Sequence, residues 1–573
     1  MHGWLNDPVP LRPSGPPPAA LRRHMADTVC ILDGYIDEPD CLGVPPFVSP
    51  HVRYLAGLLL AKGYTPRYFT IDQVRPLEDS LARLNHFDHL FLVAGITVPG
   101  RYLLGTPVSF REVRMLASRL SHPRLYLVGN MYLGHFLPGK RKAGQVDLSA
   151  FSLACGDDYL ERLWHGLPGR VSAFERETFI ANGTAIVQQH PMFPRVILEI
   201  ETFSGCPRLV NCSFCIEQLK NRRHTRRVAD IVAEMAAASR LGCRYFRLGN
   251  QPDIFGYQCL RHNGGYRPNV EALKRLLYTI REQVPLDVLH TDNGNPAVIA
   301  DYAQDSRAIL EVMVQTTTPG NTIALGMESA DPLVIRRNGL NARPGQVRRA
   351  VELINACGCQ RGANGMPRLL PGINLISGLP GETRHTHELN QRFLESLLAD
   401  GLLLRRINLR QVLVFPGTRI SRCKQNKHWP SWFRQAKARI RSTIDKPMLQ
   451  KVAPVATVLT DVLLEQERGG LLWGRQMGSY PLLCGIIGQG RVGEFCRLIV
   501  AGHGYRSITG LRLPADLNTL AYDQVKLLPG IGKTKQAEFI IQRPFHSLED
   551  LLRRMPGLAA HPEWHSFYRA LYP

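Results

Sequence analysis

The central part of the chain alternates short apolar, β-branched runs with longer stretches in which apolar residues recur at helical spacing. The runs at residues 196–201, 245–248, 286–290, 322–327, 372–376 and 407–415 are predicted strands. Helices are predicted between them, among others at residues 228–240, 270–283, 344–357 and 388–398. This alternation is typical of a parallel α/β sheet, and six repeats predict a partial (β/α)6 barrel.

The loops that follow these strands contain thiol, amide, carboxyl and glycine residues that could form a functional site. Three thiols come after the first strand, glycine and amide groups after the second and third, and Glu328 and Ser329 after the fourth. Glycine-rich turns at residues 377–382 and 416–418 follow the fifth and sixth. Because parallel α/β folds carry their chemistry at the carboxyl ends of the strands, we expect these groups to meet at one end of the barrel.

The flanking segments predict further domains. Residues 27–190 repeat the alternation, with strands at 28–32, 67–70, 89–93 and 125–128 and helices at 50–62, 77–84 and 109–120. This pattern predicts a Rossmann-like or flavodoxin-like α/β domain. The remaining predicted units are a proline-rich disordered tail (1–26), the barrel (191–420), a basic connector with a small mixed or β region (421–513) and a C-terminal helical domain (514–573).

Composition and charge narrow the function classes. The 573 residues include 70 Lys and Arg against 48 Asp and Glu, a net charge of +22. Twelve of the basic residues lie between Arg405 and Lys446, where Asp445 is the only acid, and such a run favours an anionic partner such as nucleic acid. No apolar stretch has the length of a membrane span, so we expect no membrane partner. Thirteen cysteines without a secretory signal predict a reducing, cytoplasmic location.

The thiols after the first strand form a compact motif, Cys206-Pro-Arg-Leu-Val-Asn-Cys212-Ser-Phe-Cys215. Three ligands can hold a metal and leave one coordination position open, as catalysis requires. Ligation by thiolates alone favours zinc or an iron–sulfur cluster. A structural zinc site would need a fourth ligand, for which His224 and Cys243 are the candidates.

With this motif, residues 195–420 resemble the radical S-adenosylmethionine (SAM) superfamily, whose usual spacing is C-x3-C-x2-C. The resemblance implies a [4Fe–4S] cluster on Cys206, Cys212 and Cys215, with SAM on the fourth iron and a reducing donor such as ferredoxin or flavodoxin. It also implies a set of SAM-binding positions: Phe214 before the last cysteine, Gly249 and Asn250 in place of a GGEP-like stretch, Glu328 and Ser329 at the ribose, and Ile376 and Gly378 along the adenine.

The whole chain resembles a mainly archaeal radical SAM family with a C-terminal helix-hairpin-helix. The stretches LGVPPFVSPHVRYLAGLLL, GCPRLVNCSFCIEQ, GRQMGSYPLL and LLPGIGKTKQAEFIIQRPF carry this likeness. In relatives the N-terminal domain binds cobalamin or a second cluster. No cobalamin signature is present, and Cys30, Cys41 and Cys155 lack the spacing of a second cluster, although they could converge in the fold.

The C-terminal turn resembles a helix-hairpin-helix that grips a nucleic-acid backbone. Gly530 and Gly532 would let the turn approach a phosphate, and Lys533 and Lys535 would supply charge. Packing of the hairpins against the rest of the protein is the alternative. The aromatic residues of the connector, Trp429, Trp432 and Phe433, could stack on unpaired bases or anchor a helix to a core.

Together these features predict a radical SAM enzyme that cleaves SAM to a 5′-deoxyadenosyl radical and modifies a nucleic acid, with tRNA favoured over DNA. One alternative is a radical SAM enzyme that acts on a protein or small molecule and has purely structural hairpins. A second alternative is a non-enzymatic, zinc-containing nucleic-acid-binding protein.

Overall fold

The computed structural model describes residues 28–36, 47–75, 79–96, 105–137, 140, 142–155, 159–169, 174–219, 223–423 and 429–571. The predicted disordered tail and Cys41 lie outside these residues. In the described part of the chain, no helix is both long enough and apolar enough to cross a membrane.

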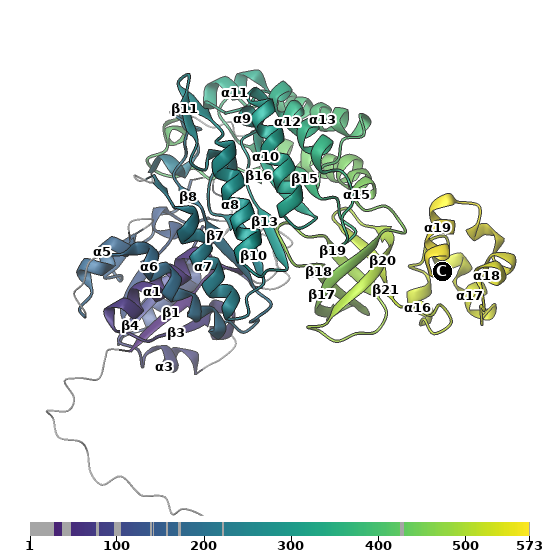
Figure 1. Ribbon diagram of the computed structural model, residues 1–573, viewed down its shortest axis with the longest axis horizontal. Coiled ribbons are helices and arrows are strands. Elements are labelled where there is room, and N and C mark those ends of the chain that lie inside the picture. Colours follow the sequence, from purple (N-terminus) through teal and green to yellow (C-terminus); the bar gives the residue numbers. More distant parts are fainter. Residues whose placement is uncertain are drawn as a thin grey trace, which may run out of the picture.

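The N-terminal sheet has five parallel strands in the order β3-β1-β4-β5-β6. They are β1 (Val29–Asp33), β3 (Pro66–Thr70), β4 (His89–Val93), β5 (Arg124–Val128) and β6 (Leu153–Cys155). This is a flavodoxin-like order with its switch point between β1 and β4, so the predicted Rossmann-like parallel sheet is present (Figure 1). The helices of this region are α1 (Pro50–Lys62), α2 (Ile71–Val74), α3 (Ser80–Leu84), α4 (Phe110–Arg119), α5 (Tyr159–Gly166) and α6 (Arg176–Asn182).

The six predicted central strands are all present, in two adjoining parallel sheets. One sheet has the order β13-β10-β7-β2 and the other β14-β15-β16. Their bounds are β2 (Phe47–Val48), β7 (Ile197–Glu201), β10 (Tyr245–Gly249), β13 (Val288–Thr291), β14 (Asn321–Glu328), β15 (Leu369–Ser377) and β16 (Arg406–Gln411). The sheets adjoin where Gly294 bridges to Leu325 and donates its N–H to the carbonyl of Ala324 at 3.0 Å. The short strand β2, which the sequence pattern did not predict, pairs with β7 and ties the N-terminal region to this unit.

Helices connect the central strands and cover the outer face of the sheets (Figure 1). Helices α7 and α8 have the predicted bounds, and α12 and α13 extend theirs slightly. The full set is α7 (Val228–Arg240), α8 (Val270–Gln283), α9 (Pro296–Asp301), α10 (Ala303–Thr316), α11 (Pro332–Asn338), α12 (Pro344–Gly358) and α13 (Arg384–Ala399). Two short hairpins complete the unit, β8 (Phe203–Ser204) with β9 (His224–Thr225) and β11 (Leu260–His262) with β12 (Gly265–Arg267).

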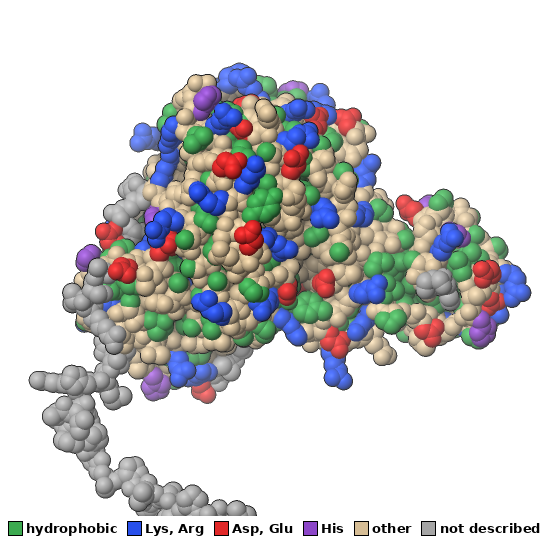
Figure 2. Space-filling model, in the orientation of Figure 1, with side chains coloured by type: hydrophobic (Ala, Val, Ile, Leu, Met, Phe, Trp, Pro, Cys, Tyr) green, Lys and Arg blue, Asp and Glu red, His purple; other side chains and the backbone are tan. Residues whose placement is uncertain are grey.

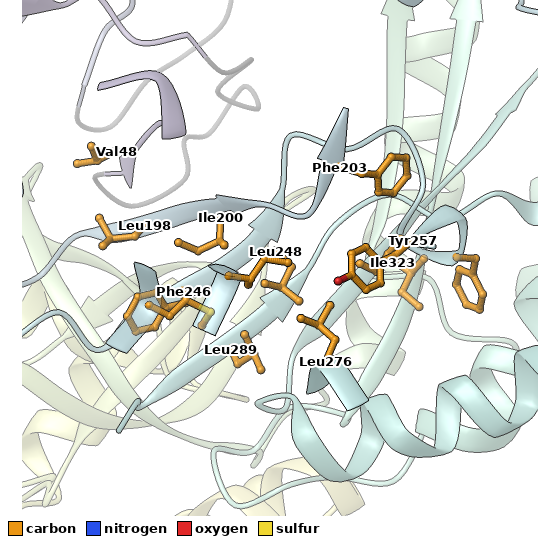
Figure 3. Packing of buried hydrophobic residues seen from close by; sticks show 14 of the residues in the cluster. Val48, Leu198, Ile200, Phe203, Phe246, Leu248, Tyr257, Leu276, Leu289 and Ile323 are labelled. Atoms are coloured by element: carbon orange, nitrogen blue, oxygen red, sulfur yellow. The ribbon is translucent and has the colours of Figure 1, made fainter. Parts of the chain in front are cut away.

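Alternation along the strands separates a helix-covered core from a polar inner face. Leu198, Phe246 and Leu289 lie on neighbouring strands and are fully buried in the main hydrophobic cluster, which Leu276 of α8 joins (Figure 3). Because successive side chains of a strand point to opposite faces, the intervening residues face the other way. These inward residues include the charged groups described below.

Residues 421–513 contain two helices followed by a closed five-stranded barrel. The helices are α14 (Trp429–Ile440) and α15 (Lys446–Val452), joined by a π-helical turn at Arg441–Asp445. The strands are β17 (Val458–Arg468), β18 (Leu471–Gln476), β19 (Leu483–Ile487), β20 (Phe495–His503) and β21 (Ser507–Leu513). Their order, β17-β18-β19-β21-β20, with β19 parallel to β21, resembles that of an OB-fold barrel.

The small barrel lies between the α/β unit and the C-terminal helices (Figure 1). Leu463 and Met477 pack against Ile197, Tyr245 and Val288 of the central strands. On its other side, residues of β19, β20 and β21 form a hydrophobic cluster with the C-terminal helices. Those helices are α16 (Tyr522–Val525), α17 (Gly532–Ile541), α18 (Leu548–Arg554) and α19 (Pro562–Leu571).

Candidate functional site

A cavity of about 460 Å³ opens at the carboxyl ends of the central strands, as the loop composition predicts. Its wall includes Asn130, at the start of the 3-10 helix that follows β5, so the carboxyl edges of both α/β units face the same space. Of the site residues predicted from the sequence, the cavity is lined by Cys206, Cys212, Cys215, Phe214, Asn250, Glu328 and Ile376.

The cysteine loop is held in place by hydrogen bonds to the end of α11. The Ser213 N–H donates to the carbonyl of Asn338 at 2.8 Å, and the Ser213 hydroxyl donates to the Asn338 side-chain oxygen at 2.7 Å. A tight turn follows, in which the Cys215 N–H donates to the carbonyl of Cys212 at 3.1 Å. The loop conformation thus presents all three thiols to one wall of the cavity.

The three thiols share a buried, mutually repulsive environment. Burial raises the pKa of Cys206 and of Cys212, and it raises the pKa of Cys215 to about 12. The charges of Glu217 and of the other two thiols also contribute to the raised pKa of Cys215. Thiolates in this position therefore need compensating positive charge. The Arg208 guanidinium supplies some of it, since it donates to the Cys212 Sγ at 3.0 Å and lowers the pKa of that thiol.

Three thiols on one loop are a donor set of the kind that iron–sulfur clusters use. Each thiolate of such a cluster binds a different iron, whereas one zinc ion needs its ligands to converge on one point. Among the described residues, no three His, Cys, Asp or Glu side chains converge in that way. His224 bonds to Glu177 at 3.3 Å and Cys243 is fully buried in the hydrophobic core, and neither lines the cavity.

An apolar wall lies beside the thiols. Phe214, Ile376 and Cys212 are half-buried and pack against one cluster that includes Leu379. Gly378 has a left-handed backbone (φ 95°), and its N–H donates to the buried carboxylate of Glu382, which also accepts from the Ser377 hydroxyl at 2.6 Å. Phe214 and Ile376 could therefore contact a flat ring, whereas Gly378 shapes the turn behind them.

The stretch after β10 approaches the cavity through its backbone. Asn250 has a left-handed backbone (φ 59°) and donates its side-chain N–H to Glu201 at 2.6 Å. A Cβ at Gly249 would lie 2.1 Å from the Glu199 carboxylate oxygen, so a larger residue would displace the buried Glu199 side chain. Residues in sparsely populated backbone regions cluster at functional sites, and Glu328 is a second example in the same wall, with φ 64°.

Glu328 presents a buried carboxyl group to the cavity. Among the described residues, its Oε2 atom has no hydrogen-bond partner, and burial raises its pKa to about 8. Such an atom would accept from a ligand hydroxyl group, as the predicted ribose contact requires. The adjacent Ser329 has another role, because its hydroxyl accepts from the Asp331 N–H at 3.1 Å at the start of α11.

The sequence pattern marked the loops after β10 and β13 but did not assign Asp253 a role. The Asp253 carboxylate accepts from the backbone of Phe255 at 3.1 Å and of Asn295 at 2.9 Å, and from the Tyr266 hydroxyl at 2.6 Å. Burial raises its pKa to about 6, against the lowering effect of these bonds. This carboxylate thus holds together two loops that line the cavity.

The sequence pattern did not predict a second group of polar residues in the cavity wall, which is centred on Tyr480. Arg247 bridges Glu199 at 3.2 Å and Asp292 at 2.6 Å, and the Tyr480 hydroxyl donates to the same Asp292. The Arg406 guanidinium lies 4.2 Å from the centre of the Tyr480 ring. Tyr480 comes from the loop between β18 and β19, so the small barrel contributes a side chain to the cavity wall. The only sequence feature that pointed to this region was the family likeness of the GRQMGSYPLL stretch.

The predicted nucleic-acid residues lie in the C-terminal helical region, on the side of the small barrel away from the α/β unit (Figure 1). Gly530 and Gly532 both have left-handed backbones, and a Cβ at Gly530 would lie 2.6 Å from the Trp564 ring. Gly532 and Lys533, at the start of α17, are exposed, and Lys535 is half-buried.

The remaining candidate residues are the connector aromatics and the cysteines outside the cysteine loop. Phe433 is 8% exposed and anchors α14, whereas Trp432 is half-buried, and the Trp429 side chain lies outside the described part. Cys30 is fully buried on β1, and two strands separate it from β6, which ends at Cys155.

Comparison with known proteins gives the family. No family model matches the chain. An uncharacterised protein of Archaeoglobus fulgidus is 40% identical over 524 residues, which cover 91% of this chain and 96% of the relative. An uncharacterised protein of Methanocaldococcus jannaschii is 36% identical over 512 residues, covering 85% and 93%. The chain belongs to the family that these archaeal proteins form.

Solved structures of radical SAM enzymes match part of this chain, each with a TM-score below 0.5. The methyltransferase TsrM of Kitasatospora setae, with cobalamin and a [4Fe–4S] cluster bound, is 14% identical with a TM-score of 0.44, over 69% of this chain and 77% of that one. The cobalamin-dependent enzyme OxsB is 12% identical with a TM-score of 0.43, over 65% and 52%. Coproporphyrinogen III oxidase (HemN) of Escherichia coli is 11% identical with a TM-score of 0.31, over 51% and 70%.

Proposed function

We propose that the chain is a radical SAM enzyme with a [4Fe–4S] cluster on Cys206, Cys212 and Cys215. The supporting observation is a single cavity at the carboxyl ends of the strands that combines three thiols from one loop with an apolar wall and a buried carboxyl oxygen without a partner among the described residues. When bound and reduced, the cluster and SAM supply a 5′-deoxyadenosyl radical.

In this proposal the chain's own residues bind and orient SAM. Phe214 and Ile376 contact the adenine, and Glu328 accepts from the ribose hydroxyl groups. The backbone at Gly249 and Asn250 faces the amino acid part of SAM. The fixed loops around Asp253 keep these groups in place, which is the condition for directing a reactive species to one atom of a substrate.

We infer further that the substrate is a nucleic acid, with tRNA favoured over DNA. Four features support this inference: the +22 charge, exposed Arg434, Lys437 and Arg439 on α14, the exposed start of α17, and the OB-like order of the small barrel. Lys and Arg side chains spread over the whole visible face and do not gather in one patch (Figure 2). A protein or small-molecule substrate remains the alternative, and analysis of cellular RNA from a deletion strain separates the two.

The cluster and its chemistry are tested with cysteine variants. Anaerobically reconstituted protein should bind iron and sulfide and, after reduction with dithionite, cleave SAM to 5′-deoxyadenosine. Cys215→Ala should lose both properties. Cys359→Ala removes an exposed thiol at the end of α12 and should retain both. Bound zinc together with no SAM cleavage by the wild type would refute the proposal.

The substrate class is tested by tRNA binding. K533E/K535E should weaken binding to bulk tRNA and lower the slope of log affinity against log salt by about 0.7–0.9 per lysine, because each contact with a phosphate releases counterions. The matched control is K274E/R275E, which makes the same charge change on the outer helix α8. Equal tRNA affinity of both variants would argue for purely structural C-terminal helices.

A further inference from the structure

Four arginines, one inside the cysteine loop and three around it, bind the backbone or a thiol of this loop. Arg208 donates to Cys212 Sγ at 3.0 Å and to the carbonyl of Gly339 at 3.0 Å. Arg223 donates to the carbonyl of Cys206, Arg261 to that of Pro207 at 3.1 Å, and Arg419 to that of Asn211 at 2.6 Å. These arginines come from four separate segments of the chain, so the fold concentrates positive charge at this one loop.

The charge of this group is not neutralised locally. Among the residues that the structure describes, none of the four guanidinium groups forms an ion pair with a carboxylate, although 26 such pairs or His–carboxylate contacts occur elsewhere. Arg223, Arg261 and Arg419 are exposed. The surface around the loop therefore attracts an acidic partner.

The same surface carries exposed aliphatic side chains. Leu209 and Val210, inside the cysteine loop, are 66% and 57% exposed. Arg261 of β11 is bonded to the loop at Pro207, so the β11–β12 hairpin adjoins the loop. An apolar centre with a charged rim is typical of a protein–protein interface.

We propose that Leu209 and Val210, with the exposed Arg223, Arg261 and Arg419 bonded to the same loop, form the docking surface for an acidic one-electron carrier protein of the ferredoxin or flavodoxin class. This inference rests on the proposed function. Leu209 and Val210 belong to the loop that carries the three thiols, so a carrier bound to them would lie against the segment that holds the proposed cluster. The carrier loses one electron and the cluster gains it, and that electron is the one that reductive cleavage of SAM consumes.

A protein explains the surface better than a nucleic acid does. Phosphates require cations, and bases stack on aromatic side chains, whereas the exposed side chains between the arginines are aliphatic. Charge complementarity and a small apolar centre suit a transient electron-transfer complex, which steers by charge and dissociates readily.

The test uses L209S/V210S, with V492S/I541S as the matched control. Val492 and Ile541 are 56% and 79% exposed and lie in the small barrel region and the C-terminal helices. The first measurement is the affinity of the protein, without its cluster, for purified flavodoxin. We expect L209S/V210S to weaken binding at least about tenfold, the control to bind as the wild type does, and added salt to weaken binding in all cases.

The second measurement is SAM cleavage with two electron sources. L209S/V210S should cleave SAM slowly with NADPH, flavodoxin reductase and flavodoxin, but at the wild-type rate with dithionite, which needs no docking surface. Equal flavodoxin binding and equal flavodoxin-driven rates in variant and wild type would overturn the docking proposal. So would selective loss of tRNA binding in L209S/V210S, which would assign the surface to nucleic acid. Absence of dithionite-driven cleavage in the wild type would instead contradict the proposed function.

Discussion

At the scale of single residues, the site places charged groups where burial makes their charged forms unfavourable. The thiols of the cysteine loop have raised pKa values, so thiolates there need positive charge, which the Arg208 guanidinium supplies at Cys212 and the proposed cluster would supply at all three. Asn250 and Glu328 have left-handed backbone conformations, which residues other than glycine adopt less often. Both residues line the cavity, which indicates that the surrounding structure holds them in these conformations for function.

Arg208→Gln tests this electrostatic role. The substitution removes the guanidinium from the Cys212 thiolate, and partners of metal ligands typically contribute 10–100-fold to metal affinity. We expect reconstituted Arg208→Gln to lose iron to a chelator about tenfold faster than the wild type. Arg240→Gln, an exposed arginine at the end of α7, is the control and should retain iron normally. Equal iron loss by both variants would show that Arg208 has no part in holding the cluster.

At the scale of elements, the small barrel contains a buried ion pair. The Arg475 guanidinium on β18 donates two hydrogen bonds to the Glu465 carboxylate on β17, at 2.7 and 2.8 Å, and both side chains are at most 1% exposed. A buried pair with this geometry compensates its own desolvation, but the loss of one partner leaves an uncompensated charge. The pair therefore makes the barrel sensitive to substitution at either position.

Glu465→Gln should lower the free energy of unfolding of the barrel by about 3–5 kcal/mol, because it removes the carboxylate charge that pairs with the buried Arg475 guanidinium. Glu467→Gln, two residues further along the same strand and exposed, should change it by less than about 0.5 kcal/mol. Replacement of the pair by E465L/R475M should be much milder than E465Q alone. Urea denaturation of the full chain measures the stability of all three variants. Wild-type stability of E465Q would contradict a stabilising role of the Glu465–Arg475 pair.

At the scale of the whole molecule, the small barrel is docked on the inner face of the central strands through both apolar and polar contacts. His290 on β13 is fully buried and uses both ring nitrogens: Nδ1 accepts from the Ser479 N–H at 2.8 Å, and Nε2 lies 3.1 Å from the Thr318 carbonyl. This arrangement suits the neutral ring with its proton on Nε2. A Cβ at Gly478 would lie 2.4 Å from the His290 ring, so the backbone of the loop between β18 and β19 packs directly against this ring.

This contact makes stability depend on pH. Burial, and to a lesser extent the charge of Arg247, lowers the pKa of His290 to about 4, from an ordinary value of 6.5. Between these values the unfolded chain binds the proton more readily, so the stabilisation is complete above about pH 6.5 and is lost as the pH falls toward 4. We expect His290 to account for a loss of about 2 kcal/mol between pH 7 and pH 5.

His290→Gln should therefore show a smaller loss of stability between pH 7 and pH 5 than the wild type, when both are measured by urea denaturation. Some pH dependence should persist in the variant, because burial also lowers the pKa of His190 to about 4. His385→Gln, which changes an exposed histidine on α13, should keep the full wild-type dependence. An unchanged pH dependence in His290→Gln would contradict the role of the buried ring.

The sequence by itself determined the parts of this protein that depend on neighbouring residues. Apolar periodicity located the six central strands, and α7 and α8 have the predicted bounds, because a strand or helix that buries one face must repeat its apolar residues at that element's period. Loop composition located the end of the strands at which the thiols, Asn250 and Glu328 meet, because parallel strands bring their carboxyl ends to one edge.

Only the tertiary structure decided the contacts between residues far apart in the chain. Tyr480 reaches Asp292 across 188 residues, β2 pairs with β7, and the five strands after α15 close into a barrel. No local pattern encodes these pairings, since each depends on the shape of two surfaces that form separately and then pack. The buried state of Glu328 and the ring of arginines around the cysteine loop have the same origin, because burial and charge concentration are properties of the assembled fold.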